Sequence, residues 1–197
     1  IATLLAYAAR LSASRIAFAA NRFASLGYAI PGAVIAVGVL LPVGRLDNLI
    51  ADWARAQLGL DPGLVLTGSI AALVYAYLVR FLAIALQTVE AGLGKIRPSM
   101  EDAARSLGHT PTQTLVRVHA PMMRGSVFTA ALIVFVDVMK ELPATFALRP
   151  FNFDTLAVQT YNLAKDERLT EASVAALAIV VVGLIPVLLL ARAMARR

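Results

Sequence analysis

The chain has 197 residues, of which 59% are hydrophobic and only 15% are charged. A soluble domain of this size needs more polar surface, so the composition excludes an ordinary globular protein and predicts an integral membrane protein. The formal net charge of +6 comes from basic residues spread between apolar stretches, which argues against a nucleic-acid partner. The absence of cysteine excludes disulfides, thiolate metal sites and a cysteine nucleophile.

Apolar stretches predict part of one membrane-spanning helix followed by four complete ones. The first nine residues, Ile1 to Ala9, are apolar but too few to cross a bilayer. Since no initiator Met or signal-peptide pattern precedes them, we expect the end of a span in a fragment of a longer chain. The later stretches are close to the roughly 20 residues that cross about 30 Å of hydrocarbon as a helix. These four spans are expected at Phe23 to Val43, Leu64 to Leu86, Ser126 to Leu148 and Ser173 to Leu190.

Small residues indicate how the expected spans pack. Glycine, alanine and serine on a helix face allow two backbones to approach closely inside a membrane. The residues concerned are Gly32, Gly38, Gly68, Ser69, Ala71, Ala72 and Ala76. The predicted fold class is therefore all-α, a polytopic transmembrane helical bundle, with no shift in composition that would mark a second domain.

The charges between the spans predict the orientation in the membrane. One set of connections, Arg10 to Arg22, Gln87 to Arg124 and the tail after Leu190, holds eleven basic residues against three acids. The other set, Gly44 to Gly63 and Arg149 to Ala172, holds five against seven. Because basic residues concentrate in short loops on the inner side, we expect the first set and the carboxyl terminus to be cytoplasmic.

The connection from Gln87 to Arg124 is the longest, and it is expected to begin with a short helix. Ser99 followed by Asp102 resembles a capping box, and acids in the first turn suit the helix dipole. Gly108 is a natural stop for a helix. The first helix of this loop is therefore expected from about Ser99 to Leu107.

A second short helix is expected in the same loop. Thr110 is followed by Pro111 and Gln113, which repeats the pattern of a cap, a proline at the first helical position and a polar partner. Pro121 is expected to end this helix. Such capping predicts an ordered loop, which either docks a cytoplasmic partner or simply joins two spans.

Charged residues interrupt the stretch that is expected to run outward. Asp137, Lys140 and Glu141 lie in its outer half, where charge facing lipid is costly, so we expect them to face the bundle interior or a watery mouth. Asp137 and Lys140 can pair, and Pro143 can bend the helix. The cluster either lies on a substrate path or neutralises itself near the outer interface. Arg80 is expected to snorkel near the inner end of its span as a structural residue.

Neither a nucleotide site nor a metal site stands out. Gly94 and Lys95 are followed by Ile96, and Val89 occupies the position of the first glycine of a phosphate-binding loop, so ATP binding by that route is not expected. His109 and His119 lack a third ligand at helical spacing. We therefore expect no catalytic residue, resident metal or cofactor in this chain.

A spaced motif runs through the loop that we expect in the cytoplasm. Its residues are Asp102, Ala103, Ala104, Gly108, Val118, Ala120 and Pro121. The pattern resembles the E-A-A, x3, G, x9, I, x, L, P loop of the permeases of binding-protein-dependent ABC importers. The chain differs from that pattern in having Asp102 for Glu, Val118 for Ile and Ala120 for Leu.

The resemblance implies a type I importer permease in the bacterial inner membrane. In that family this loop sits in a groove on the ATP-hydrolysing subunit and transmits its closure to the membrane helices. The residues implied for coupling are Glu101, Asp102, Ala103, Ala104, Leu107, Gly108 and Pro121. The implied partners are ABC ATPase subunits that bind the ATP, a periplasmic substrate-binding protein, and a second permease half.

Three further segments resemble the ferric-iron branch of the same family: Ser25 to Gly32, Asp137 to Ala147 and Leu148 to Ala172. This implies ferric iron as the cargo and the present chain as the C-terminal half of a longer permease. Other cargoes of the class, namely thiamine, a polyamine or an oxyanion, stay open. Outside the class, the alternatives are a secondary transporter with Asp137 and Glu141 as coupling carboxylates, and a membrane anchor.

Overall fold

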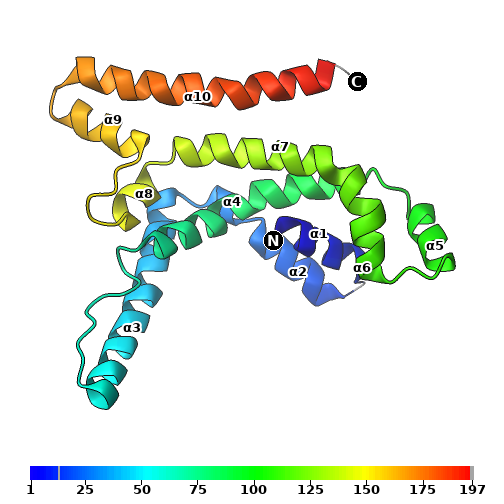
Figure 1. Ribbon diagram of the computed structural model, residues 1–197, viewed down its shortest axis with the longest axis horizontal. Helices are drawn as coiled ribbons and strands as arrows, with labels where there is room; N and C mark the ends of the chain where they lie inside the picture. Colours follow the sequence, from blue (N-terminus) through cyan, green and yellow to red (C-terminus); the bar gives the residue numbers. More distant parts are fainter. Residues whose placement is uncertain (13, 196–197) are drawn as a thin grey trace. The chain divides into compact units, whose positions relative to one another are not determined.

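The computed structural model describes residues 1–12 and 14–195, and all regular elements within these ranges are helices (Figure 1). The predicted all-α class is confirmed. In chain order the elements are α1 (Ala2–Leu11), α2 (Arg15–Ala24), the 3₁₀ turn η1 (Gly27–Ala29), α3 (Gly32–Leu58), α4 (Ile70–Leu93), α5 (Pro98–Ser106), α6 (Pro111–Thr114), the π turn η2 (Leu115–His119), α7 (Ala120–Met139), α8 (Pro143–Leu148), α9 (Leu156–Lys165) and α10 (Leu169–Ala195).

Four helical stretches among the described residues are long and apolar enough to cross a membrane. They are Gly32–Leu58, Ile70–Leu93, Pro111–Met139 and Leu169–Arg192. Helix α1 is apolar but shorter, as predicted. The number of complete spans therefore agrees with the prediction, and the side that faces the cytoplasm stays a prediction.

The helices form two compact units, which are described separately. Unit 1 consists of Ile1–Tyr28 and Phe81–Phe135, and unit 2 of Ala29–Arg80 and Val136–Arg197. The apolar core of unit 1 joins α1, α4 and α7 through Ala6, Leu86, Val89, Leu93, Ile96, Met123 and Ala130. The core of unit 2 joins α3, α4 and α8 through Ile35, Ala36, Val39, Leu73, Ala76, Ala144 and Leu148.

Helix α3 lies further along the chain than the predicted span from Phe23 to Val43. It begins after Pro31, whose extended backbone separates it from the preceding 3₁₀ turn. It ends before Gly59, which has a left-handed φ of 63°. The polar residues after Gly44 therefore extend the helix instead of forming a loop.

A buried carboxylate near the middle of α3 organises the connection to α4. Asp47 is fully buried and accepts hydrogen bonds from the backbone N–H groups of Val65 (3.0 Å), Leu66 (2.7 Å) and Thr67 (2.6 Å). Gly68, with φ 72°, then turns the chain into α4. Helix α4 consequently starts later than the predicted span, because residues 65–67 are held as a loop against α3.

Two other spans are longer than predicted. Helix α4 continues past the expected end at Leu86, and its polar residue Glu90 is satisfied by the side-chain amide of Asn21, which donates at 2.9 Å. Helix α10 covers the expected Ser173 to Leu190 and extends beyond both ends. The last two residues of the basic tail, 196–197, lie outside the described residues.

Helix α7 ends at Met139, before the predicted end at Leu148. Pro143 has no N–H to bond the carbonyl of Met139, and the chain leaves the helix over residues 140–142. Pro143 then occupies the first turn of α8, where a missing N–H costs nothing. The expected bend is therefore a complete break between two helices.

Pro121 does not end a helix, in contrast to the prediction. The residues just before it, Leu115–His119, form a π turn in which the N–H of Ala120 bonds the carbonyl of Leu115. A widened turn of this kind relieves the clash between a proline ring and the carbonyl four residues earlier. The helical stretch Pro111–Met139 stays continuous and changes direction between the parts labelled α6 and α7 (Figure 1).

Two glycines mark close helix contacts. A Cβ atom on Gly32 would lie 2.6 Å from Oε1 of Glu141, and one on Gly92 would lie 2.5 Å from Cβ of Ser126. Both distances are shorter than real Cβ contacts, so a side chain at position 32 would have to displace the ends of Arg80 and Glu141, and one at position 92 would have to displace Ser126. A Cβ atom on Gly38 would meet no atom of another element within 4 Å among the described residues, so the predicted packing role of Gly38 is not found there.

Of the other small residues, Ala71 is exposed, in contrast to the prediction, and the rest have packing or turn roles. Ala72 and Ala76 are buried in α4, as predicted. Gly68 and Ser69 precede α4 and belong to its entry turn. In contrast, α10 exposes most of its long apolar side chains within the chain, which suits contact with lipid or another polypeptide.

Candidate functional site

Helix α5 has one buried face and one exposed face. Glu101 and Ala104 are three residues apart, share a face and are buried, whereas Asp102 and Ala103 are exposed. The Asp102 side chain is 71% exposed and lies 3.9 Å from Arg105, which follows it by three residues. The two neighbouring acids thus face different surroundings, one inside unit 1 and one at its surface.

The start of α5 differs from the prediction. Arg97 is the N-cap residue, its side chain makes no capping hydrogen bond, and Pro98 occupies the first turn. Ser99 therefore lies inside the helix and forms no capping box with Asp102. Proline at the first helical position supplies the start signal instead.

The end of α5 is as predicted. Gly108 has a left-handed φ of 78°, a conformation that other residues rarely adopt. Its N–H bonds the carbonyl of Arg105 at 2.9 Å, and the N–H of His109 bonds the carbonyl of Ala104 at 3.0 Å, which together form a Schellman motif. This closure leaves the Leu107 side chain at the helix end, with 79% of the residue exposed.

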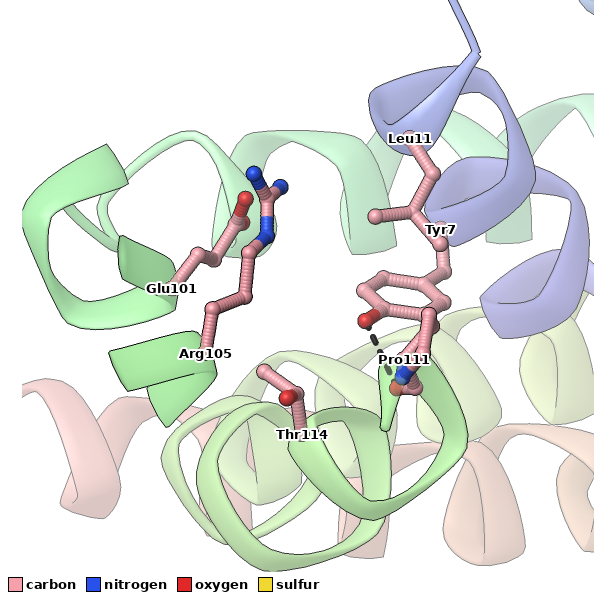
Figure 2. Close-up of a pocket in the computed structure, with 6 residues that line it drawn as sticks. All are labelled: Tyr7, Leu11, Glu101, Arg105, Pro111 and Thr114. Carbon is pink, nitrogen blue, oxygen red and sulfur yellow. Dashed lines mark hydrogen bonds between the residues drawn. The ribbon is translucent and has the colours of Figure 1, made fainter. Parts of the chain in front are cut away.

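Helix α6 starts with the predicted capping box. The N–H of Thr110 donates to Oε1 of Gln113 at 2.9 Å, and the N–H of Gln113 donates to Oγ1 of Thr110 at 3.3 Å. The carbonyl of Pro111 accepts a 2.8 Å hydrogen bond from the hydroxyl of Tyr7 on α1 (Figure 2). The turn between α5 and α6 is thereby fixed locally and also tied to α1.

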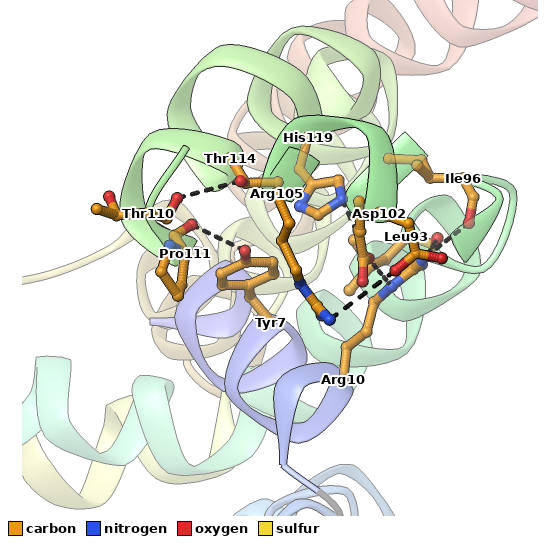
Figure 3. Close-up of polar contacts among 11 residues, drawn as sticks. Tyr7, Arg10, Leu93, Ile96, Asp102, Arg105, Thr110, Pro111, Thr114 and His119 are labelled. Atoms are coloured by element: carbon orange, nitrogen blue, oxygen red, sulfur yellow. Dashed lines mark hydrogen bonds and ion pairs between the residues drawn. The ribbon is translucent and has the colours of Figure 1, made fainter. Parts of the chain in front are cut away.

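The buried acid of α5 is held by two basic side chains from other helices. Oε1 of Glu101 lies 2.5 Å from Nε of Arg10 on α1 and 3.2 Å from Nε2 of His119 on η2. The guanidinium group of Arg10 also donates to the carbonyl of Ile96 at 2.6 Å and to that of Leu93 (Figure 3). One arginine therefore joins α1 to the end of α4, to the following turn and to α5.

Sequence reasoning missed both partners of Glu101. Arg10 counted only as a basic residue of a connecting segment, and His119 only as a weak metal-ligand candidate. His119 is fully buried, and its ring packs edge-on to that of Tyr7 at a centroid distance of 5.1 Å. The only local signal was an arginine at the end of an apolar stretch, which does not identify a partner so far along the chain.

A cavity of about 260 Å³ lies beside this contact (Figure 2). Its lining comes from α1, α5 and α6, and consists of Tyr7, Leu11, Glu101, Arg105, Pro111 and Thr114. The cavity shows that α1 and α5 are not packed tightly along their whole contact. Polar side chains bridge the space between them.

The seven residues implied for coupling are therefore divided by the structure. The exposed side of α5 and its end present Asp102, Ala103, Leu107 and Gly108. The buried side presents Glu101 and Ala104. Pro121 lies at the start of α7, where it accompanies the π turn.

The three charged residues expected near a substrate path do not form one group in unit 2. Asp137 is buried in the last turn of α7, and its Oδ1 lies 2.9 Å from Nζ of Lys140, which is the predicted pair. The Lys140 side chain is 62% exposed. Glu141 has different partners.

Glu141 stabilises the connection between α7 and α8. Its buried carboxylate accepts hydrogen bonds from the backbone N–H groups of Ala144 (3.2 Å) and Thr145 (2.9 Å) and from the hydroxyl of Thr145 (2.9 Å). It also lies 3.3 Å from Nη1 of Arg80. Arg80 sits in the middle of α4 and pairs with this acid, so its expected snorkelling near a span end is wrong.

Within residues 1–12 and 14–195, no group of three or more histidine and acidic side chains is placed to hold a metal ion. Asp137 and Glu141 each use their oxygens on protein partners. The contacts of Glu101 in unit 1 and of Glu141 in unit 2 therefore position helices, through ion pairs and hydrogen bonds to backbone groups.

Comparison with known proteins places these features in a family. Residues 1–197 match the family described as binding-protein-dependent transport system inner membrane component. Among solved structures, a bacterial ABC transporter involved in the import of the acidic polysaccharide alginate has a similar fold. Its TM-score is 0.70 at 18% identity, over 99% of this chain and 71% of that one.

Several curated relatives are permeases. The Fe(3+)-transport system permease protein FbpB 2 of Haemophilus influenzae is 30% identical over 118 residues, which is 60% of this chain and 23% of that protein. The ferric transport system permease protein FbpB of Actinobacillus pleuropneumoniae is 27% identical over 84% of this chain and 24% of its own length. PhnV of Salmonella typhimurium, assigned to a 2-aminoethylphosphonate transport system, is 26% identical over 83% of this chain and 57% of its own length.

The chain spans about a quarter of the length of the two ferric relatives. The family match nevertheless extends over all its residues, and its four long apolar helices agree with a multi-pass membrane protein. The chain belongs to the family of inner membrane components of binding-protein-dependent transport systems, the permeases of ABC importers.

Proposed function

We propose that this chain is the permease part of an ATP-driven importer of ferric iron, which a periplasmic binding protein delivers and a separate pair of ABC ATPase subunits powers. The observation that carries the coupling proposal is the exposed side of α5, where the side chains of Asp102 and Leu107 are exposed and Gly108 ends the helix. A partner protein could therefore make a charged contact with Asp102 and an apolar contact with Leu107.

The proposed coupling loop is Gln87 to Arg124, on the cytoplasmic side together with the carboxyl terminus. Two capped ends, at Gly108 and Thr110, hold this loop in one conformation before a partner binds. A preformed surface loses less entropy on docking than a flexible one. The loop also continues directly into the span Pro111–Met139, so that force on it reaches the membrane.

Ferric iron is supported by the resemblance to the two FbpB proteins. The resemblance to PhnV supports an oxyanion as the second candidate cargo. Asp137 and Lys140 are proposed to lie beside the substrate path, because Lys140 is largely exposed while its partner acid is buried. Glu141, also predicted there, would act on the path only through the fold of α7 and α8.

The test uses the complete transporter, with its ATPase, binding protein and remaining permease part, in sealed vesicles. Uptake of radioactive ferric iron is expected to require ATP, and Gly108→Leu is expected to abolish it while the protein still inserts. The matched control is Gly59→Leu, because Gly59 also has a positive φ and no neighbour within 4 Å but ends α3 instead of α5.

Three results would contradict the proposal in whole or in part. Uptake that survives Gly108→Leu, or that an uncoupler stops while ATP stays intact, would favour a secondary transporter. Uptake of 2-aminoethylphosphonate with no uptake of iron would keep the coupling proposal and overturn the cargo.

A further inference from the structure

Helix α5 depends on contacts with other helices for its position. It has nine residues, and an isolated helix of that length is not stable in water. Its buried residues are Glu101 and Ala104, of which the alanine offers one methyl group. The contacts of the Glu101 side chain are therefore the main ones that hold α5 against the rest of unit 1.

From these contacts we infer that Arg10 and Glu101 form a clasp that makes α1 move together with α5, so that Arg10 is a positioning residue for ATP-driven transport. The inference rests on the proposed function, in which an ATPase moves α5. It assigns a role to Arg10, which lies outside the loop motif.

The clasp is built to transmit force. Arg10 grips Glu101 at 2.5 Å and at the same time donates to the carbonyls of Leu93 and Ile96. Leu93 is the last residue of α4, and its carbonyl also accepts a hydrogen bond from the N–H of Ile96. The negative end of the helix dipole lies there, so a guanidinium group is well suited to this position. A displacement of α5 would therefore pull on α1 and on the end of α4 together.

Burial makes this contact different from a surface ion pair. The side chains of Arg10 and Glu101 are 18% and 10% exposed, and the fully buried side chain of His119 approaches the same carboxylate oxygen as Arg10. Buried charges are weakly screened, and loss of one partner leaves the other uncompensated. Asp102, only one residue away but 71% exposed, provides the contrast within the same helix.

Beside the clasp, a cavity takes the place of the apolar packing that could otherwise make α1 and α5 move together. About 260 Å³ of space lies between Tyr7 and Leu11 of α1 and Arg105 of α5. Close apolar packing is missing at that place, so side-chain packing cannot replace the ion pair there. The clasp and the hydrogen bond from Tyr7 to Pro111 bridge the gap.

A distance measurement tests the clasp directly. The chain has no cysteine, so spin labels can be placed on cysteines introduced at Leu4 and Ser99, which are exposed on α1 and α5. In the assembled transporter, the distance between the labels is expected to be equal in the nucleotide-free and ATP-bound states. In Glu101→Gln or Arg10→Gln, the distribution of this distance is expected to broaden, or the distance is expected to differ between the two states. Asp102→Asn is expected to leave the distance unchanged.

A transport measurement gives the second readout. Glu101→Gln is expected to lower iron uptake per ATP hydrolysed by about tenfold while ATP hydrolysis by the complex continues, because the loop still docks. Asp102→Asn is expected to lower hydrolysis and uptake together. Arg10→Lys, which keeps the charge but cannot reach all three partners, is expected to fall between wild type and Arg10→Gln.

The inference is overturned if the wild-type distance changes between the nucleotide states. It is also overturned if Glu101→Gln keeps both the wild-type distance and the wild-type ratio of uptake to hydrolysis. Failure of the proposed function has a different signature, since the wild-type complex would then show no ATP-dependent uptake. The distance measurement in unit 1 does not depend on the identity of the cargo.

Discussion

Gly32 lies directly against Arg80, since a Cβ atom at position 32 would overlap the guanidinium group and come within 2.6 Å of Oε1 of Glu141. The ion pair between Arg80 and Glu141 thus packs against the backbone at the start of α3. A helix start without a side chain at this point lets arginine and glutamate approach each other inside unit 2.

Gly32→Ala is expected to displace Arg80 from Glu141 and to destabilise the protein by about 1–3 kcal/mol, the usual cost of overpacking. Thermal unfolding in lipid nanodiscs measures the effect. Gly38→Ala is the matched control, because Gly38 is in the same helix and has no neighbour within 4 Å in the chain. Equal melting temperatures for the two variants would contradict the close contact at Gly32.

Glu141→Gln is expected to be strongly destabilising. The change removes the negative charge 3.3 Å from Nη1 of Arg80 and weakens the cap of α8, and breaking a buried pair on one side costs about 3–5 kcal/mol. Lys140→Gln is the control, since Lys140 is largely exposed and a surface pair contributes about 0–1 kcal/mol. Denaturant unfolding compares the two variants.

The same pair of variants separates structure from transport. Glu141→Gln is expected to reduce uptake in proportion to the loss of folded protein, with the ATPase still docked. A variant that unfolds normally but transports poorly would place Glu141 on the substrate path itself, and wild-type transport in a stable variant would deny it both roles.

Asp47→Asn is expected to loosen the connection between α3 and α4. The amide group would set an N–H against the N–H of Thr67, which now donates to the carboxylate at 2.6 Å. Hydrogen bonds to a charged group contribute about 1.5–3 kcal/mol each. Hydrogen exchange at Val65, Leu66 and Thr67 is expected to be faster, whereas Asp52→Asn, at a site 71% exposed, is expected to leave it unchanged.

Gly92→Ala is expected to push α4 away from α7 at Ser126, whose Cβ would be only 2.5 Å from the new methyl group. The expected loss of stability is again about 1–3 kcal/mol. Ser126→Gly in the same chain should restore most of it, because the second change removes the atoms that clash. Melting temperatures of the single and double variants give the result, and a double variant no better than Gly92→Ala would refute the contact.

Local signals in the sequence predicted what depends on neighbours along the chain. The stop at Gly108 and the start at Thr110 were correct because their hydrogen bonds join residues only a few positions apart. The number of spans was correct because hydrophobic length is a local property. The family motif predicted that α5 docks an ATPase subunit, and this stays a prediction.

Contacts between distant residues account for what was missed. Asp47 extends α3 because residues 65–67 come back to it, and Glu90 is tolerated in α4 because Asn21 reaches it. The buried charge of Glu101 has its partner in Arg10, which no spacing rule connects to α5. Pro121 stays inside a helix only because the preceding turn is widened, and that widening has no simple sequence signature.

The widened turn at Leu115–His119 also gives the long helix a built-in joint. One residue more than usual is wound into that turn, and each residue of an α-helix accounts for about 100° of rotation. Rewinding it to regular geometry would swivel everything on one side of the joint against the other without breaking the rod. A change of hydrogen-bond register at this one turn would therefore rotate α6 relative to α7 about the helix axis.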